Sequence, residues 1–331
     1  MPALARRIIA KALWICAIFI GITVISFTVI HLAPGSPTDL QTTMNPEASS
    51  DARARLEALY GLDKPLHVQY VSWLSRMVRF DFGRSMSGDH RPVWDKILER
   101  LPLTFGMNVA SLILTLAITI PLGIASAYWQ GRVFDRAATI FVFIGFAMPG
   151  FWLALLLMYA FCIQWPLLPI SGLTSLGFDQ LSFTGKLWDL TSHLILPLFV
   201  YTFGSLAGMS RFMRTSMLEV LRQDYILTAR AKGLPLSTVI FKHALRNALL
   251  PVITILGLSI PALIGGSVII ESIFALPGLG QLFYQGVMAR DYPLIMGNLV
   301  LGALLTLAGN LLADLAYGLA DPRIRSGRNG Q

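Results

Sequence analysis

Six long apolar runs constrain this chain more than any other feature. A helix needs about 20 mostly apolar residues to cross a bilayer, and six runs of the 331-residue sequence reach that length. Only 13% of the residues are charged, whereas soluble domains have about 25%. The sequence therefore predicts an all-α membrane protein with six transmembrane helices. The runs are approximately Ala12–Ala33, Phe105–Trp129, Ala137–Trp165, Leu190–Met209, Leu249–Ile270 and Pro293–Leu319.

The distribution of charge predicts which helix ends face the cytoplasm. The net charge is +8, and the basic residues lie between the apolar runs rather than in one stripe. This pattern favours membrane topology over binding to nucleic acid. Segments 1–11, 132–136, 211–246 and 321–331 hold 15 basic and 4 acidic residues, whereas the loop 34–100 holds nine of each. Because short basic loops stay in the cytoplasm, both termini are expected to be cytoplasmic.

These boundaries divide the chain into four expected regions. They are an N-terminal transmembrane helix 1–33, an extracytoplasmic helical loop 34–100, a core domain 101–320 with five transmembrane helices and a cytoplasmic loop at about 211–248, and a cytoplasmic tail 321–331.

The loop 34–100 has patterns typical of three short helices. SSDARARLEALYG has Ser50 as a cap and Gly61 as a stop, and RPVWDKILERLP is expected to form a separate helix. The segment KPLHVQYVSWLSRMVRF predicts a helix that starts at Pro65 and has an apolar face. The loop is expected to be a small folded cap that docks an extracytoplasmic partner, or a solvated loop with marginal helices. The face consists of Val68, Val71, Leu74 and Val78.

Glycine and proline interrupt the apolar runs. Proline removes an intrahelical hydrogen bond, and interrupted helices often line a moving pathway. Ordinary close packing of small residues is the alternative. The positions predicted as hinges or pathway residues are Pro149, Gly257, Pro261, Gly265 and Gly266.

Side chains that carry chemistry are sparse in the runs. Glu271 and Asp314 lie near the ends of the fifth and sixth runs, where charged groups are expected to reach water. His193 is expected to be an interfacial residue, and no histidines have metal-ligand spacing. Ser267 has no histidine base, which disfavours an intramembrane enzyme. The absence of a GxxxxGK[ST] loop indicates that the chain binds no ATP itself, and no cofactor or metal is expected.

The segment 211–246 is longer than a reversal between two spans requires. MLEVLRQDYILTARAKG predicts a helix that Gly233 and Pro235 end, and LSTVIFKHALRN predicts a second one with Ser237 as a cap. Such a projecting pair is suited to dock into a groove of another protein, although an amphipathic surface anchor is the alternative. The apolar face of the first helix is predicted to consist of Met217, Val220, Leu221, Tyr225 and Thr228.

This segment resembles the cytoplasmic E-A-A-x-x-x-G loop of ABC-importer permeases. With Gly233 on the glycine of that pattern, the E-A-A places are taken by 227–229, so only Ala229 and Gly233 match. The chain is more specifically similar to the B-type permease subunits of dipeptide, oligopeptide and nickel importers. That resemblance rests on DYILTARAKGL, FKHALRNALLPVIT, ESIFALPGLGQL, RDYPLIMG and ADPRIR, and on GLDKPLHVQYVSWL and DFGRSM in the outer loop.

The resemblance implies a type I ABC-importer fold and a non-catalytic permease of a prokaryotic inner membrane. It implies a second homologous permease subunit as a heterodimer partner, two ABC ATPases that bind ATP and Mg, and an extracytoplasmic solute-binding protein. The cargo it implies is a di- or oligopeptide, with a nickel or metal-chelate importer as the alternative. It also implies that the stretch around Gly233 couples to an ATPase through Asp224, Tyr225, Thr228, Ala229, Arg230, Ala231, Lys232 and Gly233.

Overall fold

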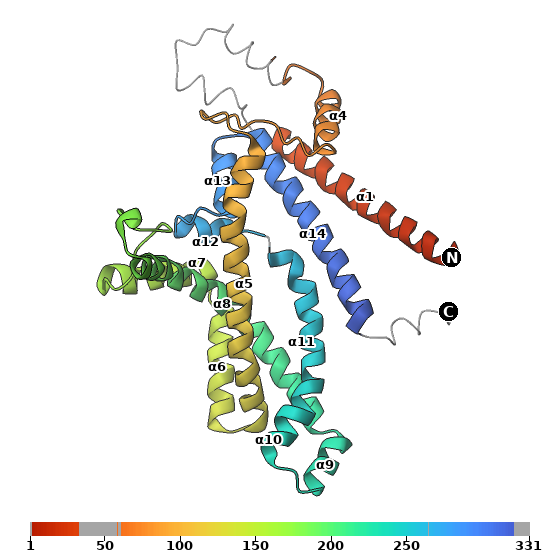
Figure 1. Cartoon of the computed structure of the whole chain (residues 1–331), viewed down its shortest axis with the longest axis vertical. Helices are drawn as coiled ribbons and strands as arrows, with labels where there is room; N and C mark the ends of the chain where they lie inside the picture. Colours follow the sequence, from red (N-terminus) through yellow and green to blue (C-terminus); the bar gives the residue numbers. More distant parts are fainter. Residues whose placement is uncertain (1, 33–57, 59–60, 264, 321–331) are drawn as a thin grey trace. The chain divides into compact units, whose positions relative to one another are not determined.

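Helices form nearly all of the regular structure in the described part of the chain (Figure 1). This computed structural model describes residues 2–32, 58, 61–263 and 265–320. Five of its helices are long and apolar enough to span a membrane, and the bent pair α6–α7 makes six if it counts as one span. The predicted all-α class is therefore confirmed, and each of the six apolar runs coincides at least in part with one of these candidate spans.

The helices of the first half of the chain are α1 (Pro2–Leu32), α4 (Leu66–Met77), α5 (Val93–Tyr128), α6 (Val133–Ala147) and α7 (Gly150–Met158), which continues as a π-helical turn (Tyr159–Gln164). Those of the second half are α8 (Phe183–Leu221), α9 (Asp224–Ala231), α10 (Leu236–Thr238) with a π-helical turn (Val239–Ala244), α11 (Leu245–Ser259) with a 3-10 turn (Ile260–Leu263), α12 (Val268–Ile273), α13 (Leu279–Met288) and α14 (Tyr292–Ala320).

The chain divides into two units, each with its own core. The first unit consists of Met1–Pro102, Ile264–Val268 and Gly278–Ala308. The second unit consists of Leu103–Leu263, Ile269–Pro277 and Gly309–Gln331.

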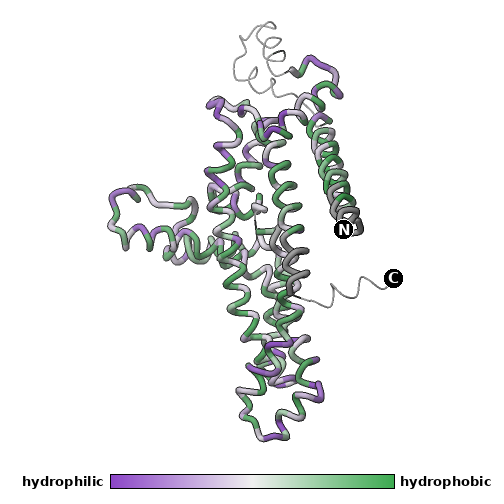
Figure 2. Tube along the Cα trace, turned by 45° about the vertical axis from the view of Figure 1, so that its right-hand side comes forward, coloured by the Kyte–Doolittle hydropathy of each residue, from purple (hydrophilic) through white to green (hydrophobic). Residues whose placement is uncertain are grey.

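The second unit is built around α8, which packs against α6, α7 and α11. Ser182 caps α8 by accepting a hydrogen bond from the backbone N–H of Gly185 at 3.2 Å. One apolar cluster joins α8 to α5, α9 and α11, and a second joins it to α7 and α12. Figure 2 shows hydrophilic residues at the α9 end of this unit and hydrophobic residues along the middle of α5 and α8.

The first unit packs α4 against α1 through aromatic side chains. Phe27 of α1 stacks on His31 at 3.9 Å between ring centroids and meets Tyr70 of α4 edge-on at 5.3 Å. Trp73 and Met77 of α4 are buried in the same cluster. The helix was predicted correctly but its buried face was not. Because Tyr70, Trp73 and Met77 form the larger apolar stripe, only Leu74 of the predicted face packs against this cluster, whereas Val68, Val71 and Val78 are exposed.

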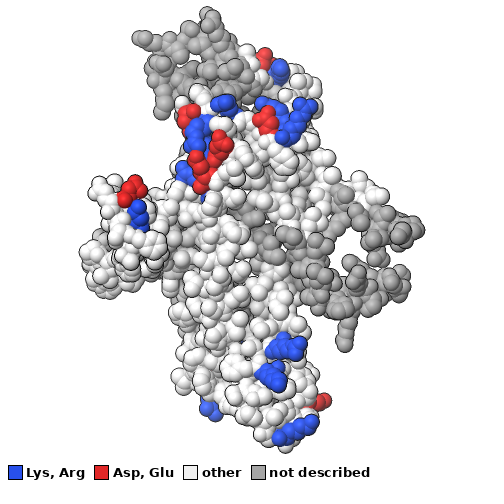
Figure 3. All heavy atoms as spheres, viewed as in Figure 1, with Lys and Arg blue, Asp and Glu red and all other residues white. Residues whose placement is uncertain are grey.

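The third helix predicted in the outer loop does not exist as a separate element. Residues 93–102 are instead the first turns of α5, which continues through Pro102 to Tyr128. The predicted boundary between 100 and 101 therefore falls inside a helix. The helix predicted in SSDARARLEALYG lies largely outside the described residues, although its expected stop, Gly61, has a left-handed φ of 67°. Figure 3 shows charged side chains over α4 and the start of α5 in this unit, and over the α9 end of the second unit.

Candidate functional site

The predicted coupling segment begins with a break after α8. That helix ends at Leu221, and Gln223 has an extended ψ of 147° before α9 starts. The sequence predicted one continuous helix with Tyr225 and Thr228 on its apolar face, and this prediction is wrong. Because the break rotates the second part, Ile226 (0% exposed) and Ala229 (7%) are buried instead.

Helix α9 is anchored on α8 and α11 by apolar packing and one polar contact. Ile226 and Ala229 belong to the cluster that includes Met213 and Met217 of α8. On the other side, the amide of Asn247 in α11 donates a hydrogen bond of 2.7 Å to the hydroxyl of Tyr225. These contacts connect α9 to both α8 and α11.

Gly233 ends α9 with a left-handed turn, at φ 75°. The backbone N–H of Gly233 donates to the carbonyl of Arg230 at 2.9 Å, and that of Leu234 donates to the carbonyl of Ala229 at 3.4 Å. These two bonds form a Schellman motif, which favours glycine at this position. The next helix, α10, begins directly after Pro235. The predicted cap Ser237 lies inside α10 and makes no capping bond.

The outward surface of α9 and its turn brings most predicted coupling residues together. Asp224, Tyr225, Thr228, Arg230, Ala231, Lys232 and Gly233 are exposed, and only Ala229 is buried. Three leucines that the prediction did not include share this surface: Leu227 is 55%, Leu234 38% and Leu236 44% exposed. Nothing in the local sequence distinguishes these exposed leucines from the buried Ile226. The surface therefore offers both apolar contact and positive charge.

The α6–α7 connection is a sharp break, not the single helix that the sequence predicted for 137–165. The two parts are bent by 99°. Pro149 is the residue before α7, and the preceding Met148 is extended at ψ 120°. The residue before a proline avoids the helical region and proline has no N–H to donate, which accounts for the break. Pro149 thus lies at a sharp bend in the second unit.

The predicted fifth span is also interrupted. Helix α11, which contains Gly257, ends at Ser259, the 3-10 turn containing Pro261 ends at Leu263, and residues 265–267 are irregular. The side-chain amide of Asn108 in α5 donates a hydrogen bond of 3.0 Å to the carbonyl of Leu263. A carbonyl at a broken helix end needs such a partner inside a membrane, and Asn108 provides it.

Gly265 and Gly266 line a cavity of about 400 Å³ in the first unit, together with residues of α13 and α14. The backbone is closely packed beside it, because a Cβ on Gly280 would lie 2.6 Å from the backbone nitrogen of Val268. Of the five predicted hinge residues, Pro149, Pro261 and the pair Gly265 and Gly266 therefore mark interruptions, whereas Gly257 lies inside α11.

Two polar residues are more buried than predicted. Glu271 was expected to reach water, but it is 3% exposed and accepts a hydrogen bond of 3.1 Å from the hydroxyl of Thr104. His193 was expected at the interface, but it is 6% exposed, and its Nδ1 lies 2.7 Å from the carbonyl of Asp189. The side chain of Asp314 lies outside the described residues. Among the described residues, no group of three His, Cys, Asp or Glu side chains is arranged to hold a metal ion.

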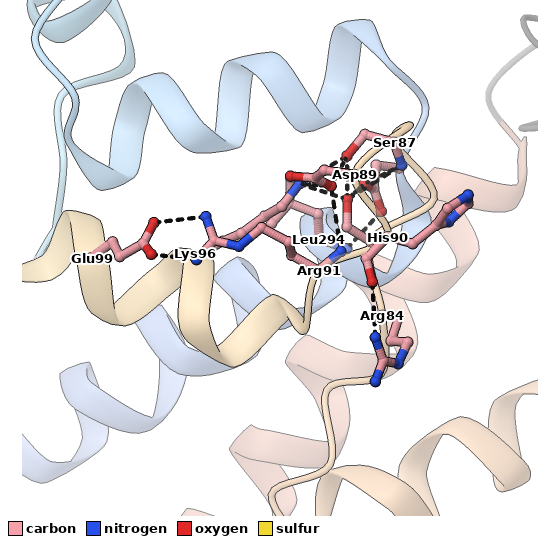
Figure 4. Close-up of polar contacts among 10 residues, drawn as sticks. Arg84, Ser87, Asp89, His90, Arg91, Lys96, Glu99 and Leu294 are labelled. Atoms are coloured by element: carbon pink, nitrogen blue, oxygen red, sulfur yellow. Dashed lines mark hydrogen bonds and ion pairs between the residues drawn. The ribbon is translucent and has the colours of Figure 1, made fainter.

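A polar cluster fixes the outer segment 81–92 in the first unit (Figure 4). The Lys96 ammonium donates to Ser85 at 2.9 Å and to Ser87 at 2.8 Å, and it lies 2.8 Å from the Asp89 carboxylate. Ser85 also donates to the buried Asp291, which accepts the Leu294 N–H at 3.2 Å and so caps α14. The hydrogen bond from Lys96 holds the pKa of the Asp89 carboxyl below its usual value.

Comparison with known proteins places these features in a family context. The sequence model described as "Binding-protein-dependent transport system inner membrane component" matches residues 119–326, and the model of the N-terminal part of such membrane components matches residues 3–108. Together the two models cover most of the chain.

Three similar proteins extend over nearly the full length. The oligopeptide transport system permease protein AppB of Bacillus subtilis is 44% identical over 97% of this chain and 99% of its own. The dipeptide transport system permease protein DppB of Escherichia coli K12 is 38% identical, over 93% and 95%. The di/tripeptide permease DppB of Pseudomonas aeruginosa is 36% identical, over 94% and 96%. Among solved structures, a chain of the inward-facing MetNI methionine ABC transporter is 18% identical, covers 66% of this chain and 95% of its own, and has a TM-score of 0.47.

Proposed function

This chain belongs to the family of binding-protein-dependent transport system inner membrane components, and we propose that it is the permease subunit of an ATP-driven importer of di- or oligopeptides. The observation that carries the proposal is the 44% identity over 97% of the chain with a protein named as an oligopeptide permease. Two further relatives named for di- or tripeptides support the same cargo class.

The complex has five subunits in this proposal. The chain pairs with a second homologous permease, two ABC ATPases bind ATP and Mg on the cytoplasmic side, and a solute-binding protein delivers peptide from outside. Both termini and α9 face the cytoplasm, which is supported by the excess of basic residues in the connecting segments on that side. The fold is of the type I importer class.

The exposed surface of α9, from Asp224 to Gly233, is the docking point for one ATPase. Its exposed leucines fit an apolar groove, and Arg230 and Lys232 fit an acidic rim. Movement of the docked α9 passes to α8 and α11, because Ile226 and Tyr225 anchor it there. The interruptions at Pro149, at Pro261 and at Gly265 and Gly266, together with Gly257 in α11, are the hinges that absorb this movement during alternating access.

Substitutions at Gly233 test the coupling role. No atom lies within 4 Å of a Cβ placed there, so a large side chain at this position points away from the chain's own core. Gly233→Trp is expected to reduce peptide uptake about tenfold, equivalent to about 1.4 kcal/mol of docking energy, while ATP hydrolysis continues. The measurement is uptake and hydrolysis by the complete complex in reconstituted vesicles.

Two matched variants separate the effect of side-chain volume at position 233 from the effect of backbone strain there. Gly233→Asn keeps the left-handed turn, which asparagine tolerates, and Gly233→Ala adds the same strain as tryptophan without its bulk. Both are expected to transport peptides at near wild-type rates. Normal peptide uptake by Gly233→Trp would mean that the segment around Gly233 does not couple the permease to the ATPase.

Cargo is tested separately with labelled dipeptides, tripeptides, longer peptides and a nickel complex. Uptake of a peptide but not of nickel supports the proposal. Uptake of only the nickel complex would replace the peptide importer with the nickel alternative.

A further inference from the structure

An apolar groove of about 440 Å³ opens between α5, α6 and α8 in the second unit. Val142, Phe143 and Phe146 of α6 line it, and Gly208 of α8 forms part of the opposite wall. A Cβ placed on Gly208 would meet no atom within 4 Å. Because Gly208 has no side chain, this wall of the groove is smooth and leaves open space beside α8.

One end of the groove is polar. Ser210 is 5% exposed, and its hydroxyl has no hydrogen-bond partner among the described residues. Arg211 is exposed and lines the groove, and no described residue pairs with its guanidinium. Arg214 lines it too, but binds the carboxylate of Asp135. A buried hydroxyl without a partner and an unpaired guanidinium together leave hydrogen-bond donors for a ligand with an anionic, oxygen-rich group.

Arg214 lies beside the connection between α5 and α6, and Ser210 and Arg211 are about one helical turn away on α8. The backbone N–H of Gly131, in that connection, donates to Asp135 at 2.8 Å, and Asp135 binds Arg214. A connection between two membrane helices marks the level at which they leave the hydrocarbon region. The arginines therefore lie at headgroup depth, and the aromatic part of the groove lies deeper in the bilayer.

We propose that this groove binds an anionic phospholipid. The phosphate lies at Arg211 and Ser210, and one acyl chain lies along Val142, Phe143 and Phe146. Basic pockets between transmembrane helices recognise such headgroups, and an acyl chain gains binding energy with each buried methylene group. A packed protein helix would cover the apolar part but would leave Arg211 without a counter-charge. The inference requires only that the chain lies in a bilayer, and it does not depend on peptide transport.

Lipid retention by the purified, assembled complex tests the site. Native mass spectrometry would count bound phosphatidylglycerol and phosphatidylethanolamine after delipidation and addition of each lipid in detergent. Arg211→Gln is expected to lower the preference for phosphatidylglycerol about fivefold, the share of one basic residue at a membrane surface. Gly208→Leu is expected to displace both lipids, because its side chain enters the groove.

Arg246→Gln is the matched control, since Arg246 is exposed on α11 and does not line the groove; it is expected to leave lipid retention unchanged. Equal lipid preference in the wild type and in Arg211→Gln would overturn the proposal. Unchanged lipid retention in Gly208→Leu, with loss of another membrane subunit from the complex, would also overturn it and assign the groove to a protein interface. Thermal unfolding of each variant checks that the fold is intact, and Arg211→Gln removes no contact within the described chain.

Discussion

Arg214 of α8 makes a bidentate contact with the carboxylate of Asp135 in α6, with hydrogen bonds of 2.7 Å from Nε and 2.8 Å from Nη2. The Asp135 carboxylate also accepts a hydrogen bond from the Gly131 N–H, so Asp135 stabilises the α5–α6 connection as well. A bidentate pair of this kind fixes orientation as well as distance. It joins the start of α6 to α8, and the two helices also pack together through Phe141 and Phe203.

Asp135→Asn is expected to lower the stability of the second unit by about 2 kcal/mol, the scale of a lost hydrogen bond to a charged group. Arg214 is 31% exposed at its side chain, so water compensates part of the loss. Thermal unfolding in detergent measures the effect. Asp179→Asn, at an exposed position, is the control. The double variant Asp135→Asn, Arg214→Gln should be more stable than the sum of the single losses predicts, and simple additivity would contradict direct coupling.

Gly280→Ala is expected to destabilise the first unit by about 1–3 kcal/mol, the cost of overpacking. Its Cβ would lie 2.6 Å from backbone atoms of both Ser267 and Val268, and backbone cannot rotate out of the way. Gly302→Ala, where a Cβ meets nothing within 4 Å, should be neutral or slightly stabilising. Expression level and unfolding temperature distinguish the two variants. Equal behaviour would mean that the irregular segment after 264 is not closely packed on α13.

The pair of Lys96 and Asp89 predicts a loss of order at low pH. The native pKa of Asp89 is lowered below 3.8, chiefly by the hydrogen bond from Lys96. The unfolded chain therefore takes up the proton first, so the contribution is present above about pH 4 and is lost as the pH falls through the native pKa. Hydrogen exchange of the Arg91 N–H, which donates to Asp89 at 3.4 Å, should quicken in that range beyond its intrinsic pH dependence.

Lys96→Met should weaken this pH dependence, because only the smaller effects of the Arg91 N–H and the Ser87 hydroxyl on the pKa of Asp89 remain. Glu99→Gln, which breaks only the exposed pair with Arg91, should retain it. The same acid transition in Lys96→Met and in the wild type would exclude the lysine as its cause.

Tyr225→Phe and Ile226→Ala compare the two anchors of α9. Tyr225 is 41% exposed, so loss of its bond to Asn247 is expected to cost about 1 kcal/mol or less. Ile226 is 0% exposed, and its truncation is expected to cost about 2–5 kcal/mol. Trypsin cleavage after Arg222 and Arg230 reports detachment of α9. Faster cleavage in Tyr225→Phe than in Ile226→Ala would reverse the proposed order of the anchors.

The sequence was sufficient for the apolar spans, but not for the breaks within them or for the buried faces of the shorter helices. Apolar length located the membrane helices because it depends on composition alone. The buried side of α4 was mispredicted because valine and tryptophan both count as apolar, and the larger Trp73 decides which side packs. The face of α9 was mispredicted because the residue types at Arg222 and Gln223 do not signal a helix break. The break depends on how α9 packs against Met217 in the folded protein.

The sequence located the candidate site but not its chemistry. Gly233 indicated the turn because glycine is the residue that most readily adopts a left-handed φ, which it has here. The exposed Leu227 and Leu236 could not be identified, since an apolar residue next to a membrane span gives no local sign of whether it is buried. Asn108, likewise, becomes a helix-end partner only through a contact over 155 positions of sequence.

The break at Pro149 has a consequence for how the protein is made. Helix α6 has 15 residues and is therefore about 22 Å long, shorter than the roughly 30 Å hydrocarbon core. Such a segment is a poor independent substrate for the insertion machinery. Its charged Asp135 finds its partner only when Arg214, 79 positions later, has been synthesised. The α5–α6 hairpin should therefore remain with the translocon, or with a membrane chaperone, until α8 emerges from the ribosome and completes it.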